Sequence, residues 1–148
     1  MSFEQTINDG IKAAMLAKDK IRLESLRAVK AAILLEKTSE NPKEIDEAEG
    51  IKMIQKLVKQ RRETAEIYSK NNRQELADKE LAEAEILEEF LPKQITPEEV
   101  EAVVKAIVAR TGATGMKDMG NVMGIVSKQL AGQADRKLIA DSVKKILQ

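Results

Sequence analysis

Apolar residues recur at intervals of three and four along almost the whole chain, and this spacing constrains the fold more than any other feature of the sequence. Such spacing places side chains on one face of a helix, whereas a half-buried strand needs apolar and polar residues to alternate. No segment of the sequence alternates convincingly, and its runs of β-branched residues are short. The sequence therefore predicts an all-α fold.

Interruptions in this spacing divide the chain into seven predicted helices. They cover approximately residues 3–17, 19–36, 44–69, 73–91, 97–110, 116–130 and 136–147. Gly50 lies inside the third helix and costs about 1 kcal/mol relative to alanine, so the first, acidic turns of that helix are expected to fray. Because helices two to four are long and closely connected, an antiparallel bundle or long hairpin is their expected packing.

Two of the three prolines, Pro92 and Pro97, mark the expected domain boundary. The chain restarts a helix there, with Thr96 and Glu99 placed as in a capping box and Pro97 at the first helical position. We predict an N-terminal long-helix bundle and a small C-terminal three-helix domain. Their expected ranges are 1–92 and 93–148.

The neutral total charge conceals an asymmetry between these two parts. The chain has 25 basic and 25 acidic residues, but residues 1–92 have a net charge of −3 and residues 93–148 a net charge of +3. An anionic partner is therefore expected on the C-terminal part.

The absence of histidine and cysteine excludes several kinds of chemistry. A chain without these residues has no Ser-His-Asp or Cys-His nucleophile, no thiolate or histidine zinc site and no disulfide. The three aromatics also provide no platform for stacking unpaired bases. We therefore expect no catalytic residues, no cofactor and no metal, and any RNA contact should read folded shape through phosphates and 2′-hydroxyls.

Three local patterns have a structural and a functional interpretation. The carboxylates of residues 83–89 could serve acid–base or metal chemistry, but a solvated helix face is the favoured interpretation. Gly120 and Gly124 are spaced to let another helix approach closely, and we expect them to pack in the core. Residues 111–118 faintly resemble a phosphate loop without its full motif, and a helix–helix connector is the favoured interpretation; in the functional alternative, free amides at the start of the next helix, beside Lys117, meet one phosphate.

The N-terminus has no basic region followed by an apolar stretch, and no apolar run approaches the length of a membrane span. We expect a cytoplasmic protein that does not contact membranes. With balanced charge, any binding to an anionic surface would have to come from local asymmetry.

A set of short motifs, taken in their order and spacing, resembles the GatB/YqeY-like family, and within it the stand-alone YqeY proteins. These motifs are Lys18-Asp-Lys20, Leu23-Glu-Ser-Leu-Arg27, Ala31-Ala-Ile33, Lys59-Gln-Arg61, Glu85-Ile-Leu-Glu-Glu-Phe-Leu-Pro92, Thr111-Gly-Ala-Thr-Gly115, Lys117-Asp-Met-Gly120, Val122-Met-Gly124 and Gly132-Gln-Ala-Asp135. The resemblance spans essentially the whole chain.

This resemblance implies two all-helical domains, the second similar to the tail of the B subunit of glutamyl/aspartyl-tRNA amidotransferase, which helps to hold tRNA. The family is often described as having carbon–nitrogen ligase activity with glutamine as amido donor, but the amidase and kinase-like domains that perform this chemistry have no counterpart here. Family members usually carry a basic residue where this chain has Gln133, and often one at Asn121. Both differences weaken expected phosphate contacts.

Three hypotheses follow. The favoured one is a non-catalytic, weakly tRNA-binding protein; the others are an amidotransferase-related accessory enzyme and a protein-interaction module. An aminoacyl-tRNA synthetase or an amidotransferase is a possible further partner. The basic residues expected to contact nucleic acid in the C-terminal part are Lys117, Lys128, Arg136, Lys137, Lys144 and Lys145.

Overall fold

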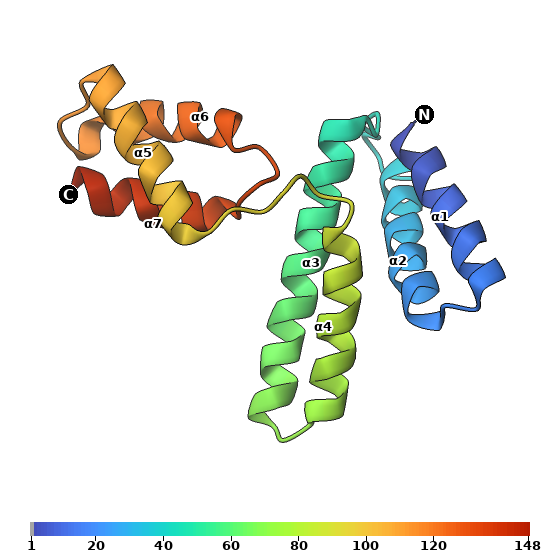
Figure 1. Ribbon diagram of the computed structural model, residues 1–148. Coiled ribbons are helices and arrows are strands. Elements are labelled where there is room, and N and C mark those ends of the chain that lie inside the picture. Colours follow the sequence, from blue (N-terminus) through green and yellow to red (C-terminus); the bar gives the residue numbers. More distant parts are fainter. Residues whose placement is uncertain (1) are drawn as a thin grey trace. The chain divides into compact units, whose positions relative to one another are not determined.

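A computed structural model describes residues 2–148, and these residues form seven α-helices and one 3₁₀ turn without any strand (Figure 1). The prediction of an all-α fold is confirmed. The chain divides into two compact units, one ending at Leu91 and the other beginning at Pro92. Each unit has its own hydrophobic core, and each is described separately.

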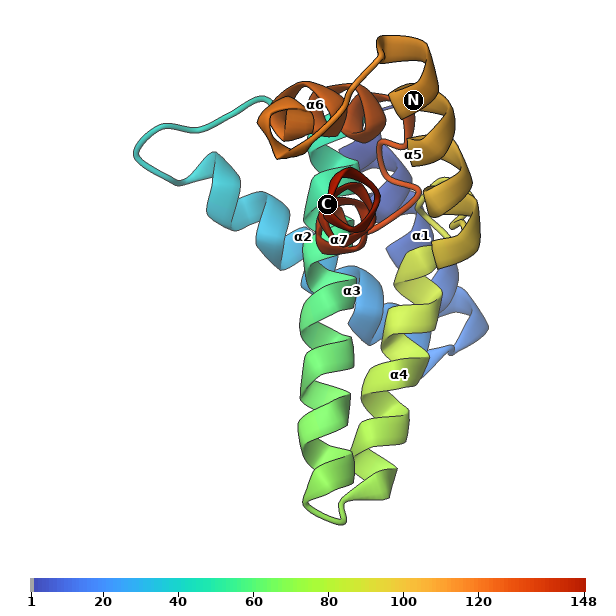
Figure 2. The ribbon, with the colours of Figure 1, turned by 90° about the vertical axis from the view of Figure 1, so that its left-hand side faces the viewer.

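The first unit consists of two helical hairpins. Its helices are α1 (Phe3–Ala17), α2 (Lys20–Lys37), α3 (Glu47–Lys70) and α4 (Gln74–Glu88). Helices α1 and α2 pair with each other, α3 and α4 pair along their length, and α2 also packs against α4. Figures 1 and 2 show the turn between α3 and α4 extending beyond the α1–α2 pair.

Aliphatic side chains from all four helices form the core of this unit. The buried cluster comprises Ile7, Leu26, Val29, Ile33, Ile54, Val58, Ala84 and Leu87. Farther along the α3–α4 hairpin the buried apolar residues are Ala65 and Ala77. Small side chains at this interface let the two helices approach closely, but they bury little apolar area.

The chain is helical at Gly50, where fraying was expected, and the structure shows why a glycine is present. Helix α3 begins at Glu47, capped by the Asp46 carboxylate, which accepts a hydrogen bond from the Glu49 amide at 2.8 Å. Gly50 is buried, and a Cβ atom there would lie 2.4 Å from a ring carbon of Phe3. The missing side chain therefore makes room for the Phe3 ring at the start of α1.

The expectation that the carboxylates of residues 83–89 form a solvated face is wrong for the first of them. Glu83 is buried, and its Oε2 accepts a hydrogen bond from Arg61 Nε on α3 at 3.2 Å. Glu88 pairs with Arg62 of α3, and Glu89 accepts a hydrogen bond from Arg22 Nη2 of α2 at 2.8 Å. These carboxylates join α4 to its neighbours, because arginine matches a carboxylate in charge and hydrogen-bonding geometry.

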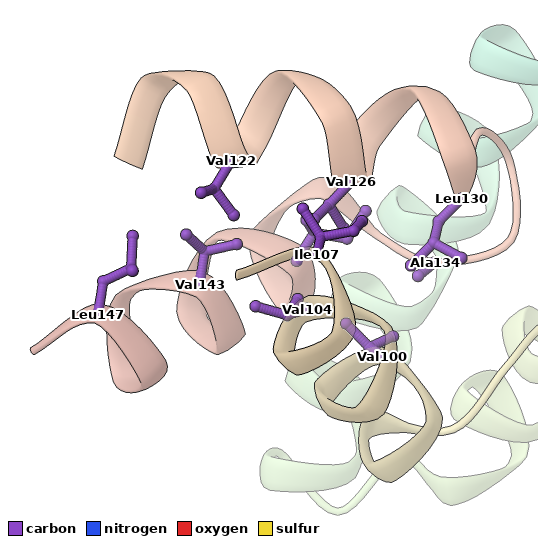
Figure 3. Close-up of a cluster of buried hydrophobic side chains, with 10 residues drawn as sticks. Val100, Val104, Ile107, Val122, Val126, Leu130, Ala134, Val143 and Leu147 are labelled. Carbon is purple, nitrogen blue, oxygen red and sulfur yellow. The ribbon is translucent and has the colours of Figure 1, made fainter. Parts of the chain in front are cut away.

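The second unit packs three α-helices around a valine-rich core (Figure 3). They are α5 (Pro97–Thr111), α6 (Met119–Gln129) and α7 (Arg136–Leu147), and a 3₁₀ turn, η1 (Met116–Asp118), precedes α6. The predicted capping box is confirmed at the start of α5. β-Branched valine is a modest helix former, so tertiary packing rather than intrinsic propensity holds these helices.

Candidate nucleic-acid interface

The core of the second unit fixes which side of α6 faces outward. Val122 and Val126 are fully buried, and Figure 3 shows both side chains directed from α6 towards α5 and α7. Gly124 lies two residues from each valine, a rotation of about 200° around a helix, and therefore occupies the opposite face. Because of this offset, the glycines of α6 face away from the core when its valines face into the core.

This outward side, which we call the glycine face, consists of Gly120, Asn121, Gly124 and Lys128, all of them exposed. A Cβ atom added at Gly120 or Gly124 would meet no atom within 4 Å. The expectation that these two glycines pack in the core against another helix is therefore wrong. They leave the backbone of α6 uncovered over one full turn, with a lysine at its far end.

Lysines lie at both ends of this face. Lys117 is exposed in η1 and Lys128 in the last turn of α6. Helix α6 has 11 residues and is about 17 Å long, and the two lysines lie at its opposite ends, so they can contact different phosphates. Helix α6 itself contains no acidic residue.

Three backbone amides of the loop before α6 already have hydrogen-bond partners. The Asp118 amide donates to the Gly115 carbonyl at 2.9 Å, and the Met119 amide donates to the Met116 carbonyl. The Asp118 carboxylate in turn accepts a hydrogen bond from the Thr114 amide at 2.9 Å. These three amides do not offer a phosphate a free donor.

The remaining predicted basic residues lie on α7, and all of them are exposed. Lys137 and Lys144 are seven residues apart and share one face of the helix, with Asp141 between them. Lys145 lies 3.5 Å from Glu101 of α5, a carboxylate that Lys105 also approaches at 3.4 Å. The hydrogen bond from Lys105 and the positive charge of Lys145 lower the pKa of the Glu101 carboxyl.

Arg136 stands in the first turn of α7, after the loop that follows Gly132. That loop is held by the segment before α5: Gln94 Nε2 donates to the Gly132 carbonyl at 2.6 Å, and the Ile95 amide donates to the Gln133 carbonyl at 3.1 Å. Asp135 stands at the N-cap of α7, but its side chain makes no capping hydrogen bond there.

Asn121 and Gln133 differ in surroundings. Asn121 is exposed on the glycine face, whereas Gln133 is half-buried in the loop between α6 and α7. A basic residue at position 121 would therefore stand on the same exposed face as Lys128.

Within residues 2–148, no group of three or more acidic side chains is arranged to hold a metal ion. None of the helices in the described part of the chain combines the length and apolar character needed to cross a bilayer.

The sequence itself contains the signal for the glycine face. Four-residue spacing shows that Gly120 and Gly124 share a face, and their offset of two from Val122 and Val126 shows which face it is. Fold and site together define an all-helical protein of two compact units, the smaller presenting an uncovered helix face between two lysines.

A family model described as "Yqey-like protein" matches residues 4–147. The chain belongs to this family, as its sequence motifs predicted.

Curated relatives share the name "Altered inheritance of mitochondria protein 41, mitochondrial". The protein from Kluyveromyces lactis is 32% identical over 93% of this chain and 72% of its own length. That from Vanderwaltozyma polyspora is 26% identical over 90% of this chain and 75% of its own length. That from Lachancea thermotolerans is 32% identical over 64% of this chain, which spans about half (51%) of that protein.

These names contradict the expected cytoplasmic location, because they assign the relatives to mitochondria. The expectation rested on the lack of a secretory signal and of an apolar run long enough to span a membrane. Neither property identifies a compartment, since the first concerns only the secretory route and the second only insertion into a bilayer.

Proposed function

We propose that the second unit binds the folded backbone of tRNA through the glycine face of α6, with Lys117 and Lys128 each contacting a phosphate. The observation that carries this proposal is the exposure of Gly120 and Gly124, where nothing covers the helix backbone. A side chain normally separates a helix axis from its partner by several ångströms. At these two residues a sugar–phosphate chain can approach the helix itself, so contact depends on the shape of the RNA.

The distribution of aromatic residues favours folded RNA over single strands. All three aromatics, Phe3, Tyr68 and Phe90, belong to the first unit. Proteins that bind single strands stack bases on aromatic side chains, and this unit has none. Recognition of double-stranded or folded RNA relies instead on phosphate and 2′-hydroxyl contacts. The similarity of this unit to a tRNA-holding tail supports the same choice.

Binding rather than catalysis is the proposed role. The amidotransferase hypothesis is tested by supplying Glu-tRNA, glutamine and ATP to this protein alone. We expect no Gln-tRNA to form, and its formation would establish the chain as an enzyme.

The binding proposal is tested by titrating fluorescently labelled total tRNA with the full chain at about 50 and 200 mM salt. Two phosphate contacts give a slope of about −2 in log K against log salt, and so roughly a tenfold loss of affinity over this range. Lys117→Glu/Lys128→Glu should abolish most of the binding. The matched control Lys93→Glu/Arg110→Glu changes the charge equally at exposed residues of the same unit that are outside the glycine face.

Equal losses in both double variants would show that only net charge matters, and the proposed site would be wrong. Absence of binding by the wild-type protein at the lower salt concentration would reject tRNA association itself.

A further inference from the structure

The tip of the α1–α2 hairpin, residues 15–21, exposes large aliphatic side chains. All seven residues of this hairpin tip are exposed, and Leu16, Met15 and Ile21 retain 78%, 54% and 41% of their accessible surface. A turn between two helices normally carries polar residues, because it projects into water. No contact described within the unit covers these three side chains.

The same tip is positively charged. Lys18 and Lys20 in the tip, and Lys12 just before it on α1, are exposed, and none of them has a carboxylate within 4.0 Å among the described residues. The single acid of the tip, Asp19, is occupied: its Oδ1 accepts a hydrogen bond from the Arg22 amide at 3.1 Å, and its Oδ2 lies 3.6 Å from Arg22 Nε. Two lysines in the tip and one beside it therefore carry ammonium groups that form no ion pair among the described residues.

One of these lysines occupies a backbone conformation that disfavours it. Lys18 ends α1 with φ 57° and ψ 33°, the left-handed region in which glycine or asparagine is preferred. Its amide donates to the carbonyls of Ala14 and Met15, so the turn is well formed. A lysine is present although glycine would suit the turn better, which indicates that its charge matters for something other than stability.

The second hairpin of the same unit provides an internal comparison. Its tip, residues 69–75, reads Ser-Lys-Asn-Asn-Arg-Gln-Glu and is entirely polar. The left-handed residue there is Asn72, with φ 58°, the residue type expected at such a position. The two turns thus share their geometry and differ in chemistry, so the apolar and cationic character of the first tip is not a requirement of turning the chain.

We propose that the α1–α2 hairpin tip docks on an anionic lipid surface. Aliphatic side chains enter the boundary between headgroups and acyl chains, while lysines remain among the headgroup phosphates. RNA would use the lysines but would gain nothing from Met15, Leu16 and Ile21, which cannot stack on bases. A convex tip also suits a flat, deformable surface better than it suits a groove.

This inference revises the expectation that the protein does not contact membranes. That expectation relied on the net charge of the chain and on the lack of a membrane-spanning segment. A membrane contact made by a few residues needs neither a large net charge nor a spanning segment. The inference is independent of tRNA binding by the second unit.

The test is co-sedimentation of the full chain with vesicles of phosphatidylcholine alone, or of phosphatidylcholine and phosphatidylglycerol in equal parts, at low ionic strength. We expect partitioning only with the anionic vesicles. Each lysine of the tip converted to glutamine should lower the partition coefficient about fivefold. Leu16→Gln should lower it several-fold, whereas Leu35→Gln, at a leucine on α2 that is 73% exposed, should leave it unchanged.

Lys18→Gly separates a lipid role from a structural one. It should raise the midpoint of thermal unfolding, because glycine suits the left-handed conformation, and still lower vesicle binding about fivefold. A matched charge control is Lys70→Gln, at the tip of the other hairpin.

Absence of sedimentation with anionic vesicles would overturn the proposal, as would equal effects of the tip and control variants. Loss of tRNA affinity in the tip variants, without a change in vesicle binding, would assign the lysines to RNA and also overturn it.

Discussion

Alanine at Gly124 should make the protein more stable and a poorer ligand for tRNA. Gly124 lies in the interior of α6, where glycine costs about 0.8–1.0 kcal/mol relative to alanine. Because an added Cβ meets nothing within 4 Å, no steric cost offsets this gain. A stabilisation of about 1 kcal/mol should raise the unfolding midpoint of a unit of this size by about 4–8 °C.

Gly50→Ala is the matched control, since it makes the same change inside another helix. There the new Cβ would lie 2.4 Å from the Phe3 ring, so α1 and α3 must separate or the ring must move. Forcing extra atoms into a packed core typically costs about 1–3 kcal/mol. The two substitutions should therefore have opposite signs in thermal unfolding followed by calorimetry, which can resolve separate transitions of the two units.

The tRNA titration supplies the second half of this prediction. Gly124→Ala should weaken binding, and Gly124→Leu should weaken it further, because each side chain holds the RNA away from the α6 backbone. Destabilisation by Gly124→Ala would show that the face is covered. Unchanged tRNA affinity in the more stable Gly124→Leu protein would show that the face is open but not the contact surface.

Three further predictions concern individual side chains. Asn121→Lys should strengthen tRNA binding and steepen the salt dependence by about 0.7–0.9, the increment for one phosphate; an unchanged slope in the same titration would place this residue outside the contact. Arg61→Leu leaves Glu83 buried without a partner and should lower the free energy of unfolding, measured in urea, by about 3 kcal/mol. The double variant Arg61→Leu/Glu83→Leu should lower it clearly less. Equal decreases in the two variants would refute the pairing. The pKa values of the Glu4 and Glu101 carboxyls are lowered, chiefly by hydrogen bonds from lysines. The stabilisation of the fold by these carboxylates is therefore complete above the unfolded-state pKa and is lost as the pH falls through the folded-state pKa values. Replacing both residues by glutamine should flatten the decrease in the free energy of unfolding at acid pH.

Two helix boundaries with local capping or turn chemistry could be predicted from the sequence. The turn at Lys18–Asp19 and the capping box at Thr96 both depend on residues within one helical turn of each other, so local sequence contains the information. Other ends shifted: α3 begins at Glu47 rather than at residue 44, although Asp46 caps it, α4 ends at Glu88 rather than Leu91, and residues 116–118 form a 3₁₀ turn.

Features that depend on distant partners could not be predicted. Gly50 suggested a frayed helix because Phe3, which fills its missing side chain, is far away in the sequence. Glu83 suggested a solvated face because its neighbours on α4 are acidic, and only the pairing of α3 with α4 brings Arg61 to it. The positions of the α6 glycines around the helix are enough to place them on the outer face. No local pattern, in contrast, reveals the contact of Gly50 with Phe3 or that of Glu83 with Arg61.

The central claim is that tRNA contacts the glycine face of α6, and the most direct test is an amide spectrum of ¹⁵N-labelled full-length protein during addition of tRNA. Glycine amides fall in a separate region of such a spectrum, and the chain has only seven glycines. The signals of Gly120 and Gly124 should shift or broaden first, while those of Gly10 and Gly50 in the first unit stay unchanged. Uniform broadening of all seven signals, or shifts that spare Gly120 and Gly124, would contradict the claim.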